Sequence, residues 1–298
     1  MKINKVLVLG IDALDYELVK EWKLKNLQQA ECGKLELPIY PGEEPNTRII
    51  WPCFITGKMP NKMGYVTGNV FKPPLQFFVN KFSPRVKSLL NPQSDEPSDI
   101  LKRKASNKIQ FSNQLYRRLK KLDLVKKPSR EDIKASTIFE NVEKSIHSHI
   151  PIYDEYLPSY SDKVVKAIEN KTYRQIFEMH CTREFNLRSN EVFDWWKRKK
   201  EWDLYMNYFW CLDGIQHAFF NNIKRIAKFY IMFDEFVGKL RKVLDDDTLL
   251  LIVSDHGQKK GIHTNYGFYS VNKPLGLKHP RLIEFKQIVE ELLEDGHT

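Results

Sequence analysis

Acidic and histidine side chains gather at three points of the sequence, each beside an apolar segment. Asp12 directly follows the run VLVLGI, and Asp255 and His256 directly follow LLLIVS. Asp213 and His217 stand four residues apart, a spacing that places both on one face of a helix. Carboxylates and imidazoles are ligands of divalent metal ions. Taken singly, each motif also fits a helix cap or a hydrogen-bonded pair.

Two loops add further candidates. His263 lies in the loop KKGIHTNYG, and Thr47 lies in the loop EEPNTRIIWP, where a turn or N-cap role is the simple alternative. Arg48 follows Thr47 and would supply a cation beside it, while Trp51 would serve either as a stacking wall for a base or as a core residue. Together, two Asp/His pairs, a further Asp, a loop His and a hydroxyl make a ligand set for two divalent ions.

Buried strands must hold these side chains in place. Apolar segments predict four strands, at 5–11, 34–39, 149–153 and 248–253. The first and last are continuous apolar runs, which are typical of parallel strands buried on both faces. A helical segment over 16–30 predicts a crossover between the first two strands, and the aromatic-rich stretch 161–221 is helical in period. The expected fold is α/β, with a central, mostly parallel sheet sandwiched by helices.

Length and charge define the domain organisation. The chain has 298 residues and a net charge of +10, and we expect a single catalytic domain over 1–298. Between Lys81 and Lys134 there are 15 basic and 6 acidic residues, an excess of nine. Proline-rich and polar stretches surround these clusters, so residues 71–134 are expected to form an inserted basic cap within the domain. Its charge fits either a solvated surface or a polyanion site that could bind nucleic acid.

Neither a membrane span nor a leader is expected. No stretch approaches the roughly 20 apolar residues that cross a bilayer. The N-terminal apolar run is stopped by Asp12 and has no small-residue cleavage site after it, so it is interpreted as a strand. Four cysteines at spacings of 21, 128 and 30 match neither a CxxC metal site nor a dense disulfide scaffold, which favours a cytoplasmic location. The oligomeric state stays open.

The order of the motifs carries a resemblance. VLVLGIDALD, TRIIWPCFITGKMPNKMG, DGIQH, VSDHG and GIH resemble the alkaline phosphatase superfamily, and within it the type I phosphodiesterase/nucleotide pyrophosphatase branch. These motifs bracket residues 6–263, with no matching motif between about 70 and 200. The resemblance implies an alkaline phosphatase-like fold with two metal sites. It assigns one ion to Asp12, Asp255 and His256 with the nucleophile Thr47 beside it, the second ion to Asp213, His217 and His263, and a phosphate contact to Asn69.

The chemistry of these residue types agrees with the resemblance. A threonine hydroxyl is a weak nucleophile at neutral pH, and coordination to a dication stabilises its alkoxide. Two ions about 4 Å apart stabilise the attacking and leaving oxygens of an in-line displacement at phosphorus. Mixed nitrogen and oxygen ligands without thiolate suit zinc, with manganese or iron as alternatives. We therefore expect a hydrolase of phosphodiester or pyrophosphate bonds in small nucleotide-type substrates, acting through a phosphothreonine intermediate.

Other functions fit the sequence less well. The loop after the first strand lacks GxGxxG and carries Asp12 where a dinucleotide pyrophosphate would have to approach. A sulfatase-type nucleophile needs a CxPxR context, whereas Cys53 is followed by FITG. A phosphomonoesterase of the same superfamily is the nearest alternative. A non-catalytic polyanion-binding protein would be marked by the loss of a ligand, and none of the ligands is missing.

Overall fold

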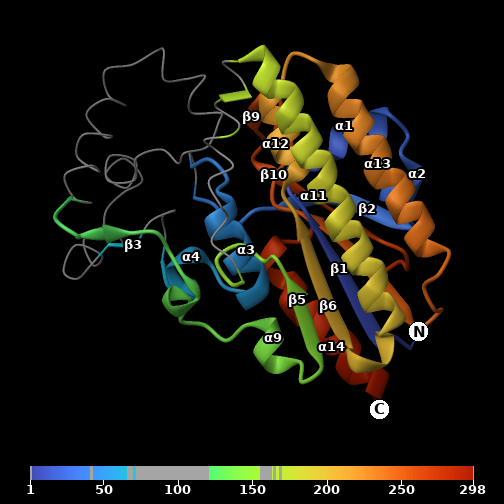
Figure 1. The fold of residues 1–298 in the computed structure, drawn as a ribbon. Helices are drawn as coiled ribbons and strands as arrows, with labels where there is room; N and C mark the ends of the chain where they lie inside the picture. The colour runs from blue at the N-terminus through green and yellow to red at the C-terminus, as the bar shows by residue number, and fades with distance from the viewer. Residues whose placement is uncertain are drawn as a thin grey trace.

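A six-stranded sheet with helices on both of its faces forms the body of the protein (Figure 1). The structure is a computed structural model, and it describes residues 2–40, 43–65, 70–71, 121–154, 163, 166–167 and 170–297. In spatial order the strands of the sheet are β2 (Glu31–Glu36), β10 (Tyr266–Val271), β7 (Thr248–Ser254), β1 (Lys5–Ile11), β6 (Leu204–Phe209) and β5 (Ser145–Ser148). From β7 to β5 all pairings are parallel, and only β10 runs antiparallel to its two neighbours. The expected α/β fold with a mostly parallel sheet is confirmed.

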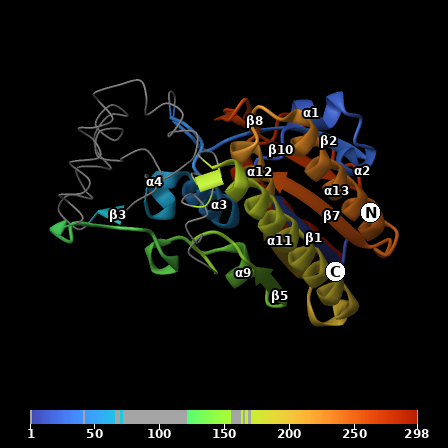
Figure 2. The ribbon, with the colours of Figure 1, turned by 45° about the horizontal axis from the view of Figure 1, so that its top comes forward.

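Helices cover the sheet in two layers (Figures 1 and 2). One layer contains α1 (Tyr16–Glu21), α2 (Lys25–Gln28), α11 (Lys171–Lys197), α12 (Cys211–Ala218) and α13 (Ile223–Arg241). The opposite layer contains α3 (Thr47–Thr56), α4 (Pro60–Met63), α9 (Ile138–Asn141) and α14 (Phe285–His297). Short 3₁₀ helices lie at Arg130–Asp132, Lys199–Glu201 and Leu282–Glu284. Two small strand pairs lie outside the main sheet: β3 (Val70–Phe71) with β4 (Val125–Lys126), and β8 (Gln258–Lys259) with β9 (Ile262–His263).

The centre of the sheet is formed by β1 and its two parallel neighbours. Val6 pairs with Leu204 of β6 on one side and with Leu249 of β7 on the other. Every residue of β6 and β7 is buried, as expected for strands covered on both faces by helices. The strands predicted at 5–11 and 248–253 are confirmed, because their uninterrupted apolar runs fit this doubly covered position.

The outer elements differ from the expectation. The strand predicted at 34–39 lies at 31–36, and the one predicted at 149–153 lies at 145–148. Both are edge strands that are only partly buried, so their apolar pattern marks their ends weakly. The segment 16–30 is not one helix but two, because Lys23 takes a left-handed backbone conformation with φ 54° between them. The segment 16–30 leads to β2, which lies at the edge of the sheet and pairs with β10 instead of β1.

The helical interpretation of 161–221 is wrong in one important place. Within this stretch, α11 and α12 are helical, but β6 between them is a central strand of the sheet. Both faces of its sequence LYMNYF are buried, so its apolar residues show neither the period of an amphipathic helix nor the two-residue alternation of a half-buried strand. Aromatic side chains are favourable in strands, and this propensity was the available signal.

Most of the expected basic cap, residues 71–134, lies outside the described residues, as do its lysine and arginine clusters up to 120. The described part, from 121 onward, contributes β4 and a 3₁₀ turn, and β4 pairs with β3. The single domain and the cap therefore stay predictions. Over the described part of the chain, none of the helices has both the length and the apolarity needed to cross a membrane.

Trp51 fastens α3 to the central strand. Its side chain is fully buried and its ring lies 5.3 Å from that of Tyr208 on β6. A Cβ atom added to Gly10 of β1 would lie 2.8 Å from Cη2 of Trp51, which is closer than van der Waals contact. The absence of a side chain at Gly10 therefore lets α3 approach the end of β1, and this close approach sets the distance between Thr47 and Asp12.

We expect Gly10→Ala to lower the free energy of unfolding by about 1–3 kcal/mol, because the tryptophan ring must move. Urea unfolding of Gly10→Ala, Trp51→Phe and the double variant measures this effect. The loss of stability caused by the alanine should be smaller in the Trp51→Phe background, since phenylalanine lacks the ring atoms that the added Cβ atom would contact. An equal penalty in both backgrounds would mean that the close contact is not its cause.

Candidate active site

The candidate ligands meet at the carboxyl edge of the parallel strands. Asp12 directly follows β1, and Asp255 and His256 directly follow β7. Asp213 and His217 lie on α12, which begins two residues after β6 ends. Since β7, β1 and β6 are neighbours and run parallel, their carboxyl ends deliver these side chains to one place. All five side chains are buried, with at most 1% of their surface exposed.

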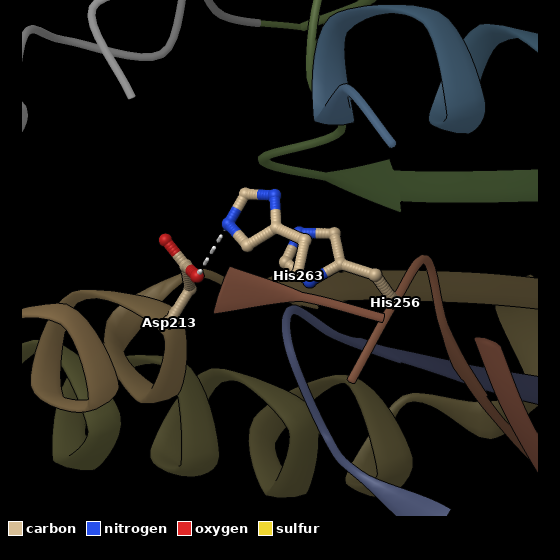
Figure 3. Close-up of side chains that lie close together, drawn as sticks. All are labelled: Asp213, His256 and His263. Atoms are coloured by element: carbon tan, nitrogen blue, oxygen red, sulfur yellow. Dashed lines mark ion pairs between the residues drawn. The ribbon is translucent and has the colours of Figure 1, made fainter. Parts of the chain in front are cut away.

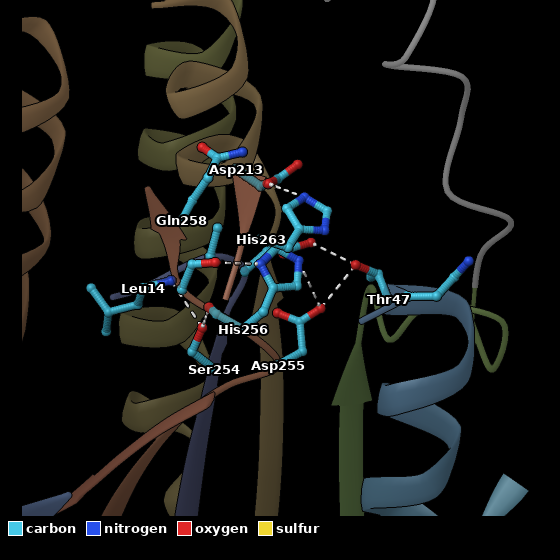
Figure 4. Close-up of polar contacts among 12 residues, drawn as sticks. Leu14, Thr47, Asp213, Ser254, Asp255, His256, Gln258 and His263 are labelled. Carbon is cyan, nitrogen blue, oxygen red and sulfur yellow. Dashed lines mark hydrogen bonds and ion pairs between the residues drawn. The ribbon is translucent and has the colours of Figure 1, made fainter. Parts of the chain in front are cut away.

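Asp12, Asp255 and His256 form the first group, and Figure 4 labels Asp255 and His256 of this group. Nε2 of His256 lies 3.3 Å from Oδ1 of Asp12 and 3.6 Å from Oδ2 of Asp255. The hydroxyl of Tyr208 on β6 donates a hydrogen bond to Oδ2 of Asp12. That bond leaves Oδ1 of Asp12 facing the rest of the group.

Thr47 joins the first group from the opposite helix layer (Figure 4). It is the first residue of α3, whose start is capped by the side chain of Asn46. The Thr47 hydroxyl donates to Oδ2 of Asp255 at 2.8 Å and lies 3.4 Å from Oδ2 of Asp12. The positive end of the α3 dipole therefore lies beside the two carboxylates, at a place where an anionic substrate would be stabilised.

Asp213, His217 and His263 form the second group. Nε2 of His217 lies 3.1 Å from Oδ1 of Asp213 and 3.0 Å from Nε2 of His263. His263 comes from β9 and lies 3.8 Å from the same Asp213 oxygen (Figure 3). The rings of His263 and His256 stack with centroids 3.9 Å apart, so the two groups are adjacent.

Burial and mutual charge govern the protonation of these groups. Burial, with the Asp255 and Asp213 carboxylates nearby, raises the pKa of Asp12 well above its ordinary value. Burial also acts to raise the pKa of Asp213, but His217, His263 and His256 outweigh it and hold that pKa well below the usual range. Burial and the neighbouring His256 and His217 lower the pKa of His263 well below that of an ordinary histidine. His263 is therefore neutral at pH 7, the form that binds a metal ion.

The residues fit a metal ion at each group. Within the first group, the ligand atoms of Asp12, Asp255 and His256 lie within 4.8 Å of one another. The same holds for Asp213, His256 and His263, a set in which His256 takes the place of His217 of the second group. In the part of the chain that the structure describes, Oδ1 of Asp12, Oδ1 of Asp255 and Nε2 of His256 are buried without a hydrogen-bond partner. Each such atom costs about 1–3 kcal/mol when it is left unsatisfied. A bound cation would satisfy all three and would offset the repulsion between the carboxylates.

Hydrogen bonds connect the loops that carry the ligands. Ala13 beside Asp12 has a left-handed backbone with φ 59°, and its carbonyl accepts a 2.6 Å hydrogen bond from the side chain of Gln216 on α12. The next amide, of Leu14, donates to Oγ of Ser254, which in turn donates to the carbonyl of His256. These bonds link the ends of β1 and β7 to α12 and hold the strained Ala13 conformation in place.

The three predicted substrate-binding residues have different outcomes. Arg48 is half-buried directly after Thr47, so it stays a candidate contact. Trp51 lies wholly in the core against Phe54 and Tyr208, in the core role that its sequence position also allowed. Asn69 lies outside the described residues.

Two site residues escaped the sequence interpretation. Tyr208 was hidden because β6 was taken for part of a helix, and a strand assignment would have placed its hydroxyl near the carboxyl edge. Gln258 follows His256 by two residues, and its side chain lies 2.9 Å from both ring nitrogens of His217. The sequence signal for Gln258 was its place at the end of the VSDHGQ motif, two residues after His256. His217, the residue that it contacts, lies 41 residues earlier in the chain.

Fold and site together define an α/β protein with acidic and imidazole side chains gathered at the carboxyl edge of its parallel strands. The sequence profile of the type I phosphodiesterase / nucleotide pyrophosphatase family matches residues 6–284. The chain therefore belongs to this family, as the motifs predicted. The membership supports a hydrolase of phosphodiester bonds.

Individual relatives are distant. GPI ethanolamine phosphate transferase 3 of Saccharomyces cerevisiae is 28% identical over 129 residues, covering 38% of this chain and only 12% of that protein. Among solved structures, the PH0037 protein from Pyrococcus horikoshii is similar with a TM-score of 0.47 and 12% identity, covering 99% of this chain and 98% of that one. Murine ectonucleotide pyrophosphatase / phosphodiesterase 5 is similar with a TM-score of 0.45 and 17% identity, covering 85% of this chain and 57% of that one. Alkaline phosphatase from the Antarctic bacterium TAB5 has a TM-score of 0.48 and 11% identity, covering 98% of each chain.

Proposed function

We propose that the protein hydrolyses phosphodiester or pyrophosphate bonds in small nucleotide-type substrates through a phosphothreonine intermediate at Thr47. The observation that carries this proposal is the position of the Thr47 hydroxyl. It lies 2.8 Å from Asp255 and 3.4 Å from Asp12, at the start of a helix and beside two groups of candidate metal ligands. Family membership supports cleavage of a phosphodiester bond, and this geometry supports Thr47 as the nucleophile.

Two divalent ions are part of the proposal. Asp12, Asp255 and His256 would hold one with Thr47, and Asp213, His217 and His263 would hold the other. The ligands are nitrogen and oxygen atoms without thiolate, which favours zinc, with manganese or iron as alternatives. Such ions lower the pKa of a coordinated hydroxyl and neutralise the charge that develops on phosphoryl oxygens.

The side chains themselves perform the remaining steps. Thr47 gives up its hydroxyl proton, with the adjacent Asp255 carboxylate as the acceptor, and its oxygen forms a bond to phosphorus. The bond to the leaving oxygen breaks in line with this attack, which leaves the phosphoryl or nucleotidyl group on Thr47. Water then attacks phosphorus from the vacated side and gives up a proton, while the threonine oxygen leaves and takes up a proton, which restores the Thr47 hydroxyl. The N-terminus of α3 stabilises the anionic phosphoryl group throughout.

Charge favours a diester over a monoester. A diester carries one negative charge, whereas a monoester at neutral pH carries nearly two and calls for further cationic groups. Arg48 stands beside Thr47 and is the cation that the motif supplies there. The single positive charge of Arg48 matches the single negative charge of a diester.

We expect kcat/KM for a 4-nitrophenyl nucleotide diester to exceed that for 4-nitrophenyl phosphate by at least about tenfold, because one charge fewer must be neutralised. Both substrates are compared at the same zinc or manganese loading, with Thr47→Ala as the background control. Faster turnover of the monoester would identify a phosphomonoesterase. Turnover of neither substrate, with retained binding of polyanions, would favour a non-catalytic binding protein.

Transfer to an alcohol is a second candidate. The similarity over 129 residues to an ethanolamine phosphate transferase favours it. The same intermediate on Thr47 would react with an alcohol instead of water, and the phosphoryl group would end on the acceptor. Phosphorus NMR of reactions run with and without ethanolamine or glycerol separates the two, because transfer gives a new phosphodiester or monoester of the added alcohol.

The basic segment and the location complete the proposal. Residues 71–134 would raise the local concentration of anionic substrate or bind nucleic acid, and exposed charges of this kind are screened over about 8–10 Å at ordinary ionic strength. A rate that is equal at low and high salt would remove this role. The four cysteines are free, which fits the proposed cytoplasmic location.

A further inference from the structure

A tight hairpin brings Gln258 to the second group of ligands. In β8 and β9, Gln258 pairs directly with His263, and residues directly opposite each other in an antiparallel pair project to the same face. Lys260 and Gly261 between the strands have φ of 51° and 80°, as required by the two-residue turn that suits a hairpin. The backbone thus directs Gln258 and the candidate ligand His263 toward the same side.

The amide of Gln258 lies against the ring of His217. The residue is 3% exposed, and its Nε2 lies 2.9 Å from Nδ1 of His217 and 2.9 Å from Nε2. Its Oε1 is also buried and, among the residues that the structure describes, has no hydrogen-bond partner. A half turn about the last side-chain torsion would exchange the two amide atoms without moving the rest of the residue.

The two nitrogens of His217 face different surroundings. Nε2 lies 3.1 Å from Oδ1 of Asp213 and 3.0 Å from Nε2 of His263, so it points to the place where these ligand atoms converge. If Nε2 binds an ion, Nδ1 must carry the ring proton and needs an acceptor. After the exchange, the amide oxygen of Gln258 lies within reach of Nδ1 and can accept its proton.

We propose that Gln258 is a positioning residue of the second metal site. Its amide oxygen accepts a hydrogen bond from Nδ1 of His217, which fixes the tautomer whose unprotonated Nε2 can bind the ion and holds the ring toward Asp213 and His263. The inference rests on the proposed function, because it presupposes that this group binds a metal ion.

Zinc binding by three variants tests the role. Gln258→Met keeps the length of the side chain but removes the acceptor, and we expect it to weaken zinc binding at one of the two sites by about 10–100-fold. Gln258→Glu keeps two acceptor oxygens and should bind zinc at least as tightly as the wild type. Gln29→Met is the matched control, since Gln29 is another largely buried glutamine but bonds to Leu250 and Ser270 inside the sheet. Competition titration with a zinc-chelating dye gives stoichiometry and affinity without any activity measurement.

The outcomes separate the inference from the proposed function. Two tight sites in Gln258→Met, or a loss in Gln258→Glu equal to that in Gln258→Met, would overturn the role of the amide oxygen alone. A wild-type protein that binds no ion would overturn the proposed metal centre together with this inference. In the zinc-free protein, ¹⁵N NMR of the histidine rings should show the His217 proton on Nδ1 in the wild type and a loss of this preference in Gln258→Met, a difference that mere packing by Gln258 would not produce.

Discussion

Replacing Thr47 by alanine is expected to reduce kcat by at least about 1000-fold, equivalent to about 4 kcal/mol of transition-state stabilisation. The alanine removes the hydroxyl oxygen that forms the proposed covalent intermediate, while the six candidate metal ligands stay in place. The measurement is kcat for a chromogenic nucleotide diester, together with the zinc content of the purified variant. Covalent capture adds a second measurement, since a phosphorylated peptide containing residue 47 should be detected by mass spectrometry only in the wild type.

Two further variants make this result specific. Thr56→Ala is the matched control, because Thr56 is buried in the same helix and its hydroxyl donates, within the described part of the chain, to the carbonyl of Pro52 and not to a candidate ligand. It should lose about 1 kcal/mol of stability and little activity. Thr47→Ser should retain activity, since it keeps a hydroxyl at the same position. If Thr47→Ala keeps more than about a tenth of the wild-type rate, direct attack by water replaces the covalent mechanism.

Removing bound metal should abolish activity and lower thermal stability. The buried carboxylates of Asp12, Asp213 and Asp255 repel one another without a cation. At a zinc concentration of about 100 times Kd, each occupied site adds about 2.7 kcal/mol to stability, which corresponds to roughly 5–10 °C in Tm for a chain of this size. Differential scanning fluorimetry of chelated and zinc-loaded protein measures the shift, and elemental analysis should find up to two equivalents of zinc.

Histidine variants localise the effect. His217→Ala should remove most of the Tm gain of one site, whereas His256→Ala should weaken both, because His256 lies close to both ligand groups. His279→Ala is the control, since His279 is exposed and belongs to neither group. Identical melting curves with and without zinc, and no retained metal after dialysis, would contradict the assignment of the ligands.

The sequence indicated the positions of the candidate ligands more directly than the boundaries of the elements around them. Asp12 and Asp255 could be found because each follows a continuous apolar run, and such runs mark central strands with little ambiguity. Asp213 and His217 were recognisable from their four-residue spacing. In each case the informative pattern is local, and the parallel order of the sheet then brings the local motifs together.

Elements whose environment is set by distant neighbours could not be predicted in the same way. β6 carries aromatic residues on both faces, which hid its strand character and with it the role of Tyr208 toward Asp12. β10 was not predicted at all, because its antiparallel place beside β7 depends on the hairpin that precedes it. The contacts of Gln258 and Gln216 are tertiary, so nothing in their own segments indicates which residues they hold.

The central position of β1 also determines when the site can form during folding. Its pairings with β6 and β7 join segments about 200 and about 240 residues apart in the chain. Contacts between such distant segments form late because closing long loops is entropically unfavourable. Asp12 and Asp255 consequently meet only after the middle of the sheet has assembled. An ion that needs both finds no preformed site in the unfolded chain. Metal binding would therefore lower the unfolding rate and leave the folding rate nearly unchanged.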